Sequence, residues 1–281
     1  YDSKGGVIVY SGKKVRDSHQ GGYGKISLAR GFEVSSNTVM VQAVYEAYKN
    51  QPSKFVNHLN NFGLNNPLVL SIKWEGISYI PQPKENHWSR LTLPWMAFGY
   101  GVMITPMQTL AFYNAVANNG EMVKPQFVTE IKEWNRTIKK YDKEVLNPRI
   151  CSKETILKLR AVLENVVKKG TGSKLYSKDF SMAGKTGTAQ VDYGKNGRSD
   201  MYYASSFVGY FPADQPKYSC IVVVHKPNTA LNNFYGADVA GPVFKRIAQK
   251  IFTDAPSTNE IKNLNRKIQK QEVDYDSYFA K

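Results

Sequence analysis

The stretch Ala183-Gly184-Lys185-Thr186-Gly187-Thr188-Ala189-Gln190 reads as a strand that faces a ligand. Two glycines weaken a strand interior, unless something has to approach the backbone closely. Because residues two apart share a face, Thr186 and Thr188 are expected to project together. Lys185 and Gly187 then lie on the other side. A lysine beside hydroxyls and bare backbone predicts a binding site for an anionic ligand that carries a carbonyl group.

A phosphate loop and an ordinary edge strand are the two alternatives for this stretch. The phosphate-loop pattern G-x-x-x-x-G-K-[ST] matches at Gly184-Lys185-Thr186, but Asp179 occupies the place of its first glycine. A phosphate loop also runs into a helix, whereas residues 192–197 are rich in turn formers. Motif and context therefore argue against a phosphate loop. An edge strand without a special role remains open for K-T-G alone.

The composition is that of a folded chain with a basic surface. Its 281 residues suffice for one large domain or two small ones, and 42% of them are hydrophobic. The formal net charge of +15 favours anionic surroundings such as nucleic acid, lipid headgroups or wall polymer. It does not choose among them, because the basic residues are scattered rather than clustered.

Neither the cysteines nor the histidines form a metal-binding pattern, so no metal site is predicted. Cys151 and Cys220 make no disulfide framework, and the histidines at positions 19, 58, 87 and 225 lack ligand spacing. No apolar run approaches the ~18 residues that cross a bilayer, and no secretory signal is visible. The chain opens on Tyr1 within sequence that already reads as folded, so we expect a fragment of a longer protein.

Hydrophobic periodicity and turn residues predict the order of helices and strands. Residues 64–101 read as irregular, and residues 257–281 as a polar, loosely packed tail after a domain over 1–256. The predicted helices cover residues 38–49, 52–62, 107–119, 152–169 and 237–252. The predicted strands cover residues 6–10, 13–17, 203–211 and 218–225, and residues 124–145 read as a solvated hairpin.

Two serine-containing motifs precede the K-T-G strand. Ser11-Gly12-Lys13-Lys14 matches S-x-x-K in form only, because such a pair works when serine and lysine occupy adjacent turns of one helix. Gly12 and its strand-like flanks instead predict a hairpin turn. Ser35-Ser36-Asn37 lies in a loop just before a helix, where serine and asparagine are common as N-caps. Taken alone, the second motif predicts no more than a helix start.

In this order the motifs resemble the transpeptidase domain of penicillin-binding proteins, whose signature includes S-x-x-K, Ser-x-Asn and K-T-G. Ser35-Ser36-Asn37 is similar to the second element and Lys185-Thr186-Gly187 to the third. Gly99-Tyr100-Gly101, followed by Thr105-Pro106-Met107-Gln108, resembles a stretch of the class B members. Among these members, the sequence pattern is most similar to that of the cell-division transpeptidases.

Two later segments extend the resemblance to residues 1–252. Residues 204–210 are similar to the strand after K-T-G, and residues 236–244 to the start of the family's last helix. The resemblance implies a mixed α/β (α+β) fold of the β-lactamase/transpeptidase type. In that fold an antiparallel sheet is flanked by helices.

The resemblance implies acyl transfer from peptidoglycan stem peptides that end in D-Ala-D-Ala, by way of a covalent serine intermediate. Ser35 would relay a proton to the leaving nitrogen. Lys185 would hold Ser35 and lower its proton affinity. Asn37 would bind both the peptide carbonyl of the substrate and the catalytic lysine.

Substrate binding is implied for the K-T-G strand. The hydroxyls of Thr186 and Thr188 would bind the substrate carboxylate, with Gly187 between them. The backbone N–H of Thr188 would supply half of the oxyanion hole. No credible S-x-x-K precedes Ser35, so the nucleophile is expected upstream of Tyr1 and this chain alone is expected to be inactive.

The resemblance also implies partners and a location. The expected partners are peptidoglycan stem peptides, β-lactam antibiotics, and proteins of the division or elongation machinery; no cofactor and no nucleic acid are expected. The location is the cell envelope, with the parent protein anchored in the inner membrane and this domain in the periplasm.

Three alternatives remain on the same residues: a penicillin-sensor module, a binder of the wall or membrane surface, and a D,D-carboxypeptidase or β-lactamase relative. The net charge of +15 motivates the second. The long segment 64–101 and the stretch from Gly99-Tyr100-Gly101 to Thr105-Pro106 argue against the third. Any cleft-based function requires residues 35–37 to lie against residues 185–188, so that one hydroxyl and one ammonium nearly touch.

Overall fold

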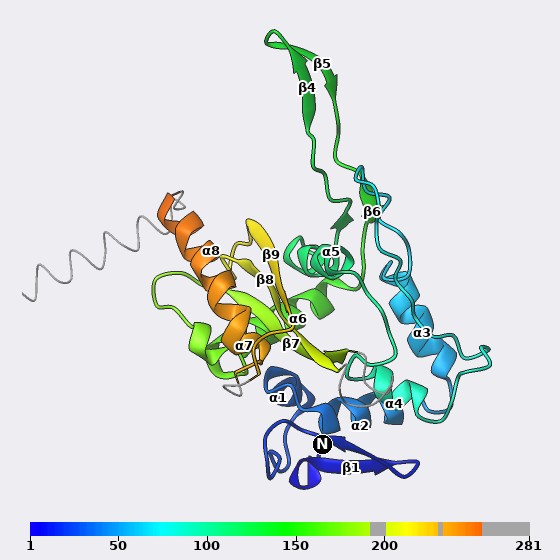
Figure 1. Ribbon diagram of the computed structural model, residues 1–281. Coiled ribbons are helices and arrows are strands. Elements are labelled where there is room, and N and C mark those ends of the chain that lie inside the picture. Colours follow the sequence, from blue (N-terminus) through cyan, green and yellow to red (C-terminus); the bar gives the residue numbers. More distant parts are fainter. Residues whose placement is uncertain (192–200, 230–232, 255–281) are drawn as a thin grey trace, which may run out of the picture.

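The computed structural model describes residues 1–191, 201–229 and 233–254 (Figure 1). Its largest sheet contains β7 (Ala183–Val191), β8 (Tyr202–Phe211) and β9 (Tyr218–His225), which pair antiparallel in that order. The predicted strands are confirmed. The K-T-G stretch lies on β7, which forms an edge of this sheet. A phosphate loop is wrong for this stretch, because the chain stays in strand through Val191.

Helices cover both faces of the sheet, as the resemblance implies (Figure 1). α5 (Pro106–Ala117) and α6 (Lys153–Lys169) pack on one face. α7 (Gly236–Val239) and α8 (Gly241–Asp254) pack on the other face. The mixed fold with an antiparallel sheet flanked by helices is therefore confirmed.

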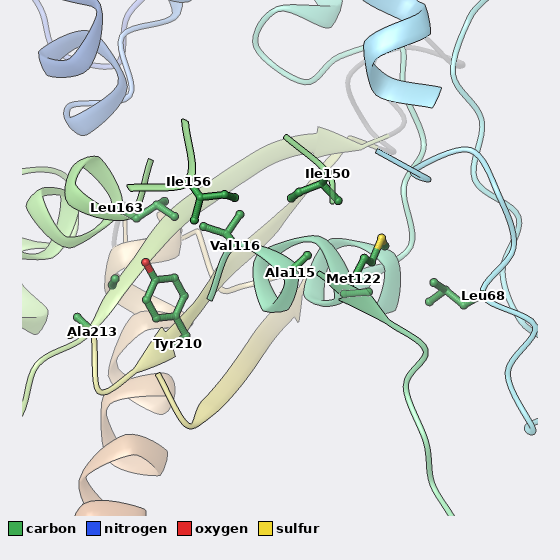
Figure 2. Close-up of a cluster of buried hydrophobic side chains, with 11 residues drawn as sticks. Leu68, Ala115, Val116, Met122, Ile150, Ile156, Leu163, Tyr210 and Ala213 are labelled. Atoms are coloured by element: carbon green, nitrogen blue, oxygen red, sulfur yellow. The ribbon is translucent and has the colours of Figure 1, made fainter. Parts of the chain in front are cut away.

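The two-residue alternation of β8 divides the core between these layers. Tyr210 is fully buried against α5 and α6, and Figure 2 shows it beside Leu163 and Ala213. Phe207 and Phe211 point the opposite way and pack on Phe244 of α8. Because β8 is buried on both faces, it fixes the position of β7, which pairs with it, and therefore the position of the K-T-G residues.

The N-terminal part supplies the wall opposite β7. Its elements are η1 (Lys4–Gly6), β1 (Val7–Tyr10), β2 (Lys13–Arg16), α1 (Leu28–Glu33), α2 (Asn37–Tyr48) and α3 (Pro52–Asn61). β1 and β2 form the predicted hairpin, and Ser11 and Gly12 turn the chain with positive φ angles of 45° and 76°. The formal S-x-x-K match at Ser11 is thus a turn rather than a helical pair.

A second hairpin projects away from the sheet (Figure 1). It contains β4 (Glu130–Glu133) and β5 (Arg136–Lys140), and every residue of both strands is exposed. β3 (Met122–Val123) pairs with β6 (Val145–Asn147) at its base. The predicted solvated hairpin is confirmed, and so are the helices that became α2, α3, α5 and α6.

Two predictions of local structure need correction. The segment 64–101 contains one short helix, α4 (Thr92–Met96), whose five residues are too few to show a periodicity in sequence. The single helix predicted over 237–252 is two helices, because Pro242 has no N–H for an intrahelical bond and its ring disfavours the preceding turn. A short helix of 3₁₀ type, η2 (Ser173–Leu175), follows α6.

The predicted tail 257–281 and the domain boundary at 256 lie outside the described residues. Within the described part of the chain, no helix combines the length and the apolar composition that crossing a bilayer requires.

Candidate functional site

Ser35 is the middle residue of the three-residue loop between α1 and α2, and it adopts a left-handed backbone conformation with φ of 56°. Its neighbour Ser36 is fully buried and caps α2 by accepting a hydrogen bond from the Val39 N–H. The N-cap role that the motif suggests therefore belongs to Ser36. The hydroxyl of Ser35 is left to point elsewhere.

Asp17, directly after β2, holds the start of α2 in place. Its carboxylate accepts hydrogen bonds from the Thr38 N–H and the Thr38 hydroxyl, each at 2.9 Å, and from the Ser36 hydroxyl at 3.0 Å. The carboxylate also lies at the positive end of the α2 dipole, which favours a negative charge. Asp17 thereby joins the N-terminal hairpin to the loop that presents Ser35.

Asn37 is the first residue of α2 and is partly buried. Its amide nitrogen donates to the backbone carbonyl of Arg16 at 2.8 Å. The side chain is therefore oriented by β2, and its amide oxygen remains as an acceptor.

Lys185 reaches from β7 to Ser35, and the distance from its Nζ to Ser35 Oγ is 2.7 Å. Nζ also donates to the Thr186 carbonyl at 3.1 Å and lies 5.7 Å from the centre of the Phe32 ring. The residue as a whole is half-buried, and these three groups surround its ammonium. Burial lowers the pKa of Lys185 to about 8. The contact predicted between residues 35–37 and 185–188 is present.

Thr186 and Thr188 project together into the cleft, as strand alternation predicts. The Thr186 hydroxyl lies 2.8 Å from the hydroxyl of Thr171, and the Thr188 hydroxyl accepts the Gly236 N–H at 3.0 Å. Each threonine is thus held by a second segment. Two hydroxyls on one strand face suit an anion such as a carboxylate, since each can donate a hydrogen bond toward it.

Gly236, at the start of α7, lies tightly against β7 at Gly187. A Cβ built on Gly236 would lie 2.4 Å from the Gly187 carbonyl oxygen and 2.3 Å from the Ser206 carbonyl oxygen. The backbone at the start of α7 therefore presses against β7. The close approach that the sequence predicts is made here by the chain itself.

The candidate site is an open cleft of about 790 Å³ between β7, the N-terminal hairpin and the α4 region. Ser35, Asn37, Thr186 and Thr188 line it, whereas Lys185 is not among the described residues that do so. The ammonium therefore acts on cleft contents through Ser35. The aromatic residues that line the cleft are Tyr23, Trp95, Phe98, Tyr100, Tyr203, Phe234 and Tyr235.

Several residues of the site carry no signal that sequence reasoning used. Asp17 is a lone acid after a strand, and Thr171 follows a helix end. Tyr100 belongs to the Gly99-Tyr100-Gly101 motif, but its contact was not predicted: its hydroxyl accepts the Gln190 N–H at 3.2 Å and ties the α4 region to β7. A search for polar residues next to predicted element ends would have found the first two.

The arrangement provides a hydroxyl that is hydrogen-bonded to a cation of lowered pKa, beside a pair of hydroxyls on an edge strand. Such a hydroxyl can pass a proton, because a lysine with a pKa near 8 exchanges its proton close to neutral pH. Within the described residues, no group of three or more histidine, cysteine or acidic side chains could hold a metal ion. The Ser35–Lys185 pair and the hydroxyls of Thr186 and Thr188 suit proton transfer and anion binding.

The chain matches a known protein family over most of its length. The family model described as "Penicillin binding protein transpeptidase domain" matches residues 1–249. Among curated relatives, peptidoglycan D,D-transpeptidase FtsI of Buchnera aphidicola (subsp. Baizongia pistaciae) is 33% identical over 168 residues, 59% of this chain and 28% of the relative. Stage V sporulation protein D of Bacillus subtilis is 29% identical over 249 residues, 86% of this chain and 36% of the relative.

Solved structures show the same fold. The transpeptidase domain of penicillin-binding protein 3 from Burkholderia pseudomallei superposes with a TM-score of 0.74 at 24% identity, over 90% of this chain and 71% of that one. Penicillin-binding protein 3 of Mycobacterium tuberculosis, complexed with aztreonam, gives a TM-score of 0.72 at 26% identity, over 89% and 56%. The chain spans about a third of the length of the curated relatives it matches.

Proposed function

Because this chain belongs to the penicillin-binding-protein transpeptidase domain family, we propose that it forms the wall of an acyl-transfer site for peptides that end in D-Ala-D-Ala. In the complete reaction, a serine attacks the carbonyl between the two D-alanines, the C–N bond breaks, and the terminal D-alanine leaves. An amine of another strand then takes the acyl group and releases the serine. The product is a cross-link in peptidoglycan.

The 2.7 Å contact between Lys185 Nζ and Ser35 Oγ is the observation that carries this function. Ser35 accepts a hydrogen bond from the ammonium, so its own O–H is free to donate to a leaving nitrogen in the cleft. Lys185 can then return a proton to Ser35. The low pKa of Lys185, about 8, makes that return easier than it is for an exposed lysine.

Substrate would bind along β7. The hydroxyls of Thr186 and Thr188 face the cleft and suit the terminal carboxylate of a D-Ala-D-Ala peptide. The Thr188 N–H would form one half of an oxyanion hole, and such a donor is worth roughly 2.7–4 kcal/mol in other acyl-transfer enzymes. Asn37, with its amide oriented by Arg16, would bind the peptide backbone.

This chain supplies the wall but not the nucleophile. Its Ser11–Lys14 match to S-x-x-K lies in the β1–β2 turn, where serine and lysine do not share a helix. The chain alone is therefore expected to bind substrate without being acylated. We assign the acylated serine to sequence outside this chain.

Intact-mass measurement after incubation with a labelled penicillin tests this assignment. No covalent adduct is expected on the chain at any time point. An adduct on Ser11 would mean that the hairpin turn is a catalytic motif. An adduct on Ser35 would mean that the Ser35–Lys185 pair is itself a nucleophile and its base.

The location and the partners follow from the same family. Relatives of this chain bear the names of a peptidoglycan transpeptidase and a sporulation protein, and a related structure holds ampicillin. We accordingly place the complete protein in the cell envelope, with its catalytic domain on the wall side of the inner membrane. There it would meet stem peptides, β-lactams and the division or elongation machinery.

A further inference from the structure

Two cations of β2 face the cleft from the side opposite β7. Lys14 and Arg16 are two residues apart, so they share a face of the strand, and both line the cleft together with Asn37. Val15 between them points the other way and is buried against Ile8 and Val41. The core contact of Val15 therefore sets the direction of the two cations.

These cations carry uncompensated positive charge. Among the described residues, neither Lys14 nor Arg16 takes part in an ion pair. Asp17, the nearest acid in sequence, is turned toward the start of α2, where three hydrogen bonds hold it. A third lining cation, Lys174, is already neutralised by Asp238 at 2.6 Å.

We propose that Lys14 and Arg16 form a second anion subsite, which binds a side-chain carboxylate of the peptide that enters the cleft. This rests on the proposed function, in which the terminal carboxylate of the same peptide is held by Thr186 and Thr188. The two subsites lie on opposite walls of one cleft, so they select a peptide that carries a carboxylate upstream of its C-terminus. Residues two apart on a strand are about 7 Å apart, which lets both cations reach one carboxylate or its near neighbour.

A paired peptide series tests the subsite on the full chain. The probes are N-acetylated peptides that end in D-Ala-D-Ala and carry either glutamate or glutamine at one of the two preceding positions. Their dissociation constants are measured by NMR titration at low ionic strength. At one of these positions the glutamate peptide is expected to bind about three- to tenfold more tightly, since each exposed ion pair contributes up to about fivefold.

Lys13 provides a matched control on the same strand. It is exposed like Lys14, but it is not among the described residues that line the cleft. Lys14→Gln and Arg16→Gln are each expected to reduce the preference for glutamate, and the double variant is expected to abolish it. Lys13→Gln removes the same charge and should leave the preference intact. The preference should also shrink with added salt.

The outcomes separate the subsite from the function it rests on. If both peptides bind equally at every position, or if Lys13→Gln acts like Lys14→Gln, the subsite is overturned while the cleft function stands. If neither peptide binds, both the proposed cleft function and the subsite are overturned. Thermal unfolding of the variants checks that the exposed substitutions leave the fold unchanged.

Discussion

Lys185 Nζ and Ser35 Oγ lie 2.7 Å apart although 150 residues separate them in the sequence. The cation is held by a hydroxyl and a backbone carbonyl and lies over the Phe32 ring, and no acid of the described residues pairs with it. A buried ammonium without a counter-charge costs free energy, because its desolvation is not offset by an opposite charge. The folded chain therefore holds a destabilising buried charge at the site where proton transfer would occur.

The buried ammonium predicts that stability rises with pH. Below pH 8 lysine is protonated in both the folded and the unfolded chain, and the full cost of burying the charge is present. Between pH 8 and 10.5 the folded chain gives up the proton while the unfolded chain keeps it, so the free energy of unfolding increases. The unfolding free energy of the parent chain minus that of Lys185→Met should therefore rise by about 2–3 kcal/mol from pH 7 to pH 10.

Urea unfolding of both proteins across this pH range checks the effect, and the tyrosines and other lysines cancel in the difference. A difference that stays constant with pH would show that the ammonium is solvated rather than buried.

The contact between Lys185 and Ser35 shows which parts of the site can be predicted from the sequence and which cannot. Strand alternation in β7 correctly predicts that Thr186 and Thr188 share the cleft face, and hydrophobic periodicity predicts the helix that follows Ser35. The same alternation places Lys185 on the opposite face of β7, but neither pattern can predict that its ammonium meets Ser35, which only the family resemblance implies. That position depends on the packing of α1 against α6, which is a long-range relationship that no local period encodes.

The same limit explains the residues that sequence reasoning missed. Asp17 binds residues 36–38 only because the β1–β2 hairpin folds onto α2, and Thr171 reaches Thr186 only because α6 ends beside β7. In both cases the residue type gives no signal by itself, and its partner is distant in the sequence. The motifs identify the chemistry, while the tertiary fold identifies what holds the chemistry in place.

Asp17 is predicted to be a major support of the α2 start. Asp17→Ala should lower the free energy of unfolding by about 2–3 kcal/mol, because it removes three charge-assisted hydrogen bonds and leaves the Thr38 N–H without its acceptor. Urea unfolding of Asp17→Ala, Thr38→Val and the double variant should give a coupling energy of about 1 kcal/mol.

Asp2 supplies the control for this cycle, because within the described part of the chain its carboxylate accepts only a local N–H, that of Lys4, at 2.9 Å. Asp2→Ala should cost about 1 kcal/mol or less. A coupling energy near zero between positions 17 and 38 would show that the two side chains do not support each other.

The contact between the start of α7 and β7 is predicted to tolerate no side chain. Gly236→Ala would place a Cβ against two backbone carbonyls, which cannot move without shifting a strand, so we expect a loss of about 1–3 kcal/mol. Gly187→Ala is the matched comparison, since its Cβ meets only the Ser206 hydroxyl, which can rotate away. Equal unfolding midpoints for the two variants would contradict the tight backbone contact.

The last prediction concerns Glu33, which is 3% exposed and whose carboxylate links α1 to α6 just before Ser35. It accepts hydrogen bonds from Arg30 and from Asn165, each at 2.9 Å, so Glu33→Gln leaves a cation without its partner at a buried junction. We expect a loss of about 1–3 kcal/mol in unfolding free energy, because Arg30 keeps some contact with solvent. Glu164→Gln breaks a comparable pair with Lys168 on the surface of α6 and should cost no more than about 0.5 kcal/mol. Hydrogen exchange should show the added opening at the α1–α6 junction in Glu33→Gln alone. If the two variants lose the same stability, the buried acid is not what fixes the approach to Ser35.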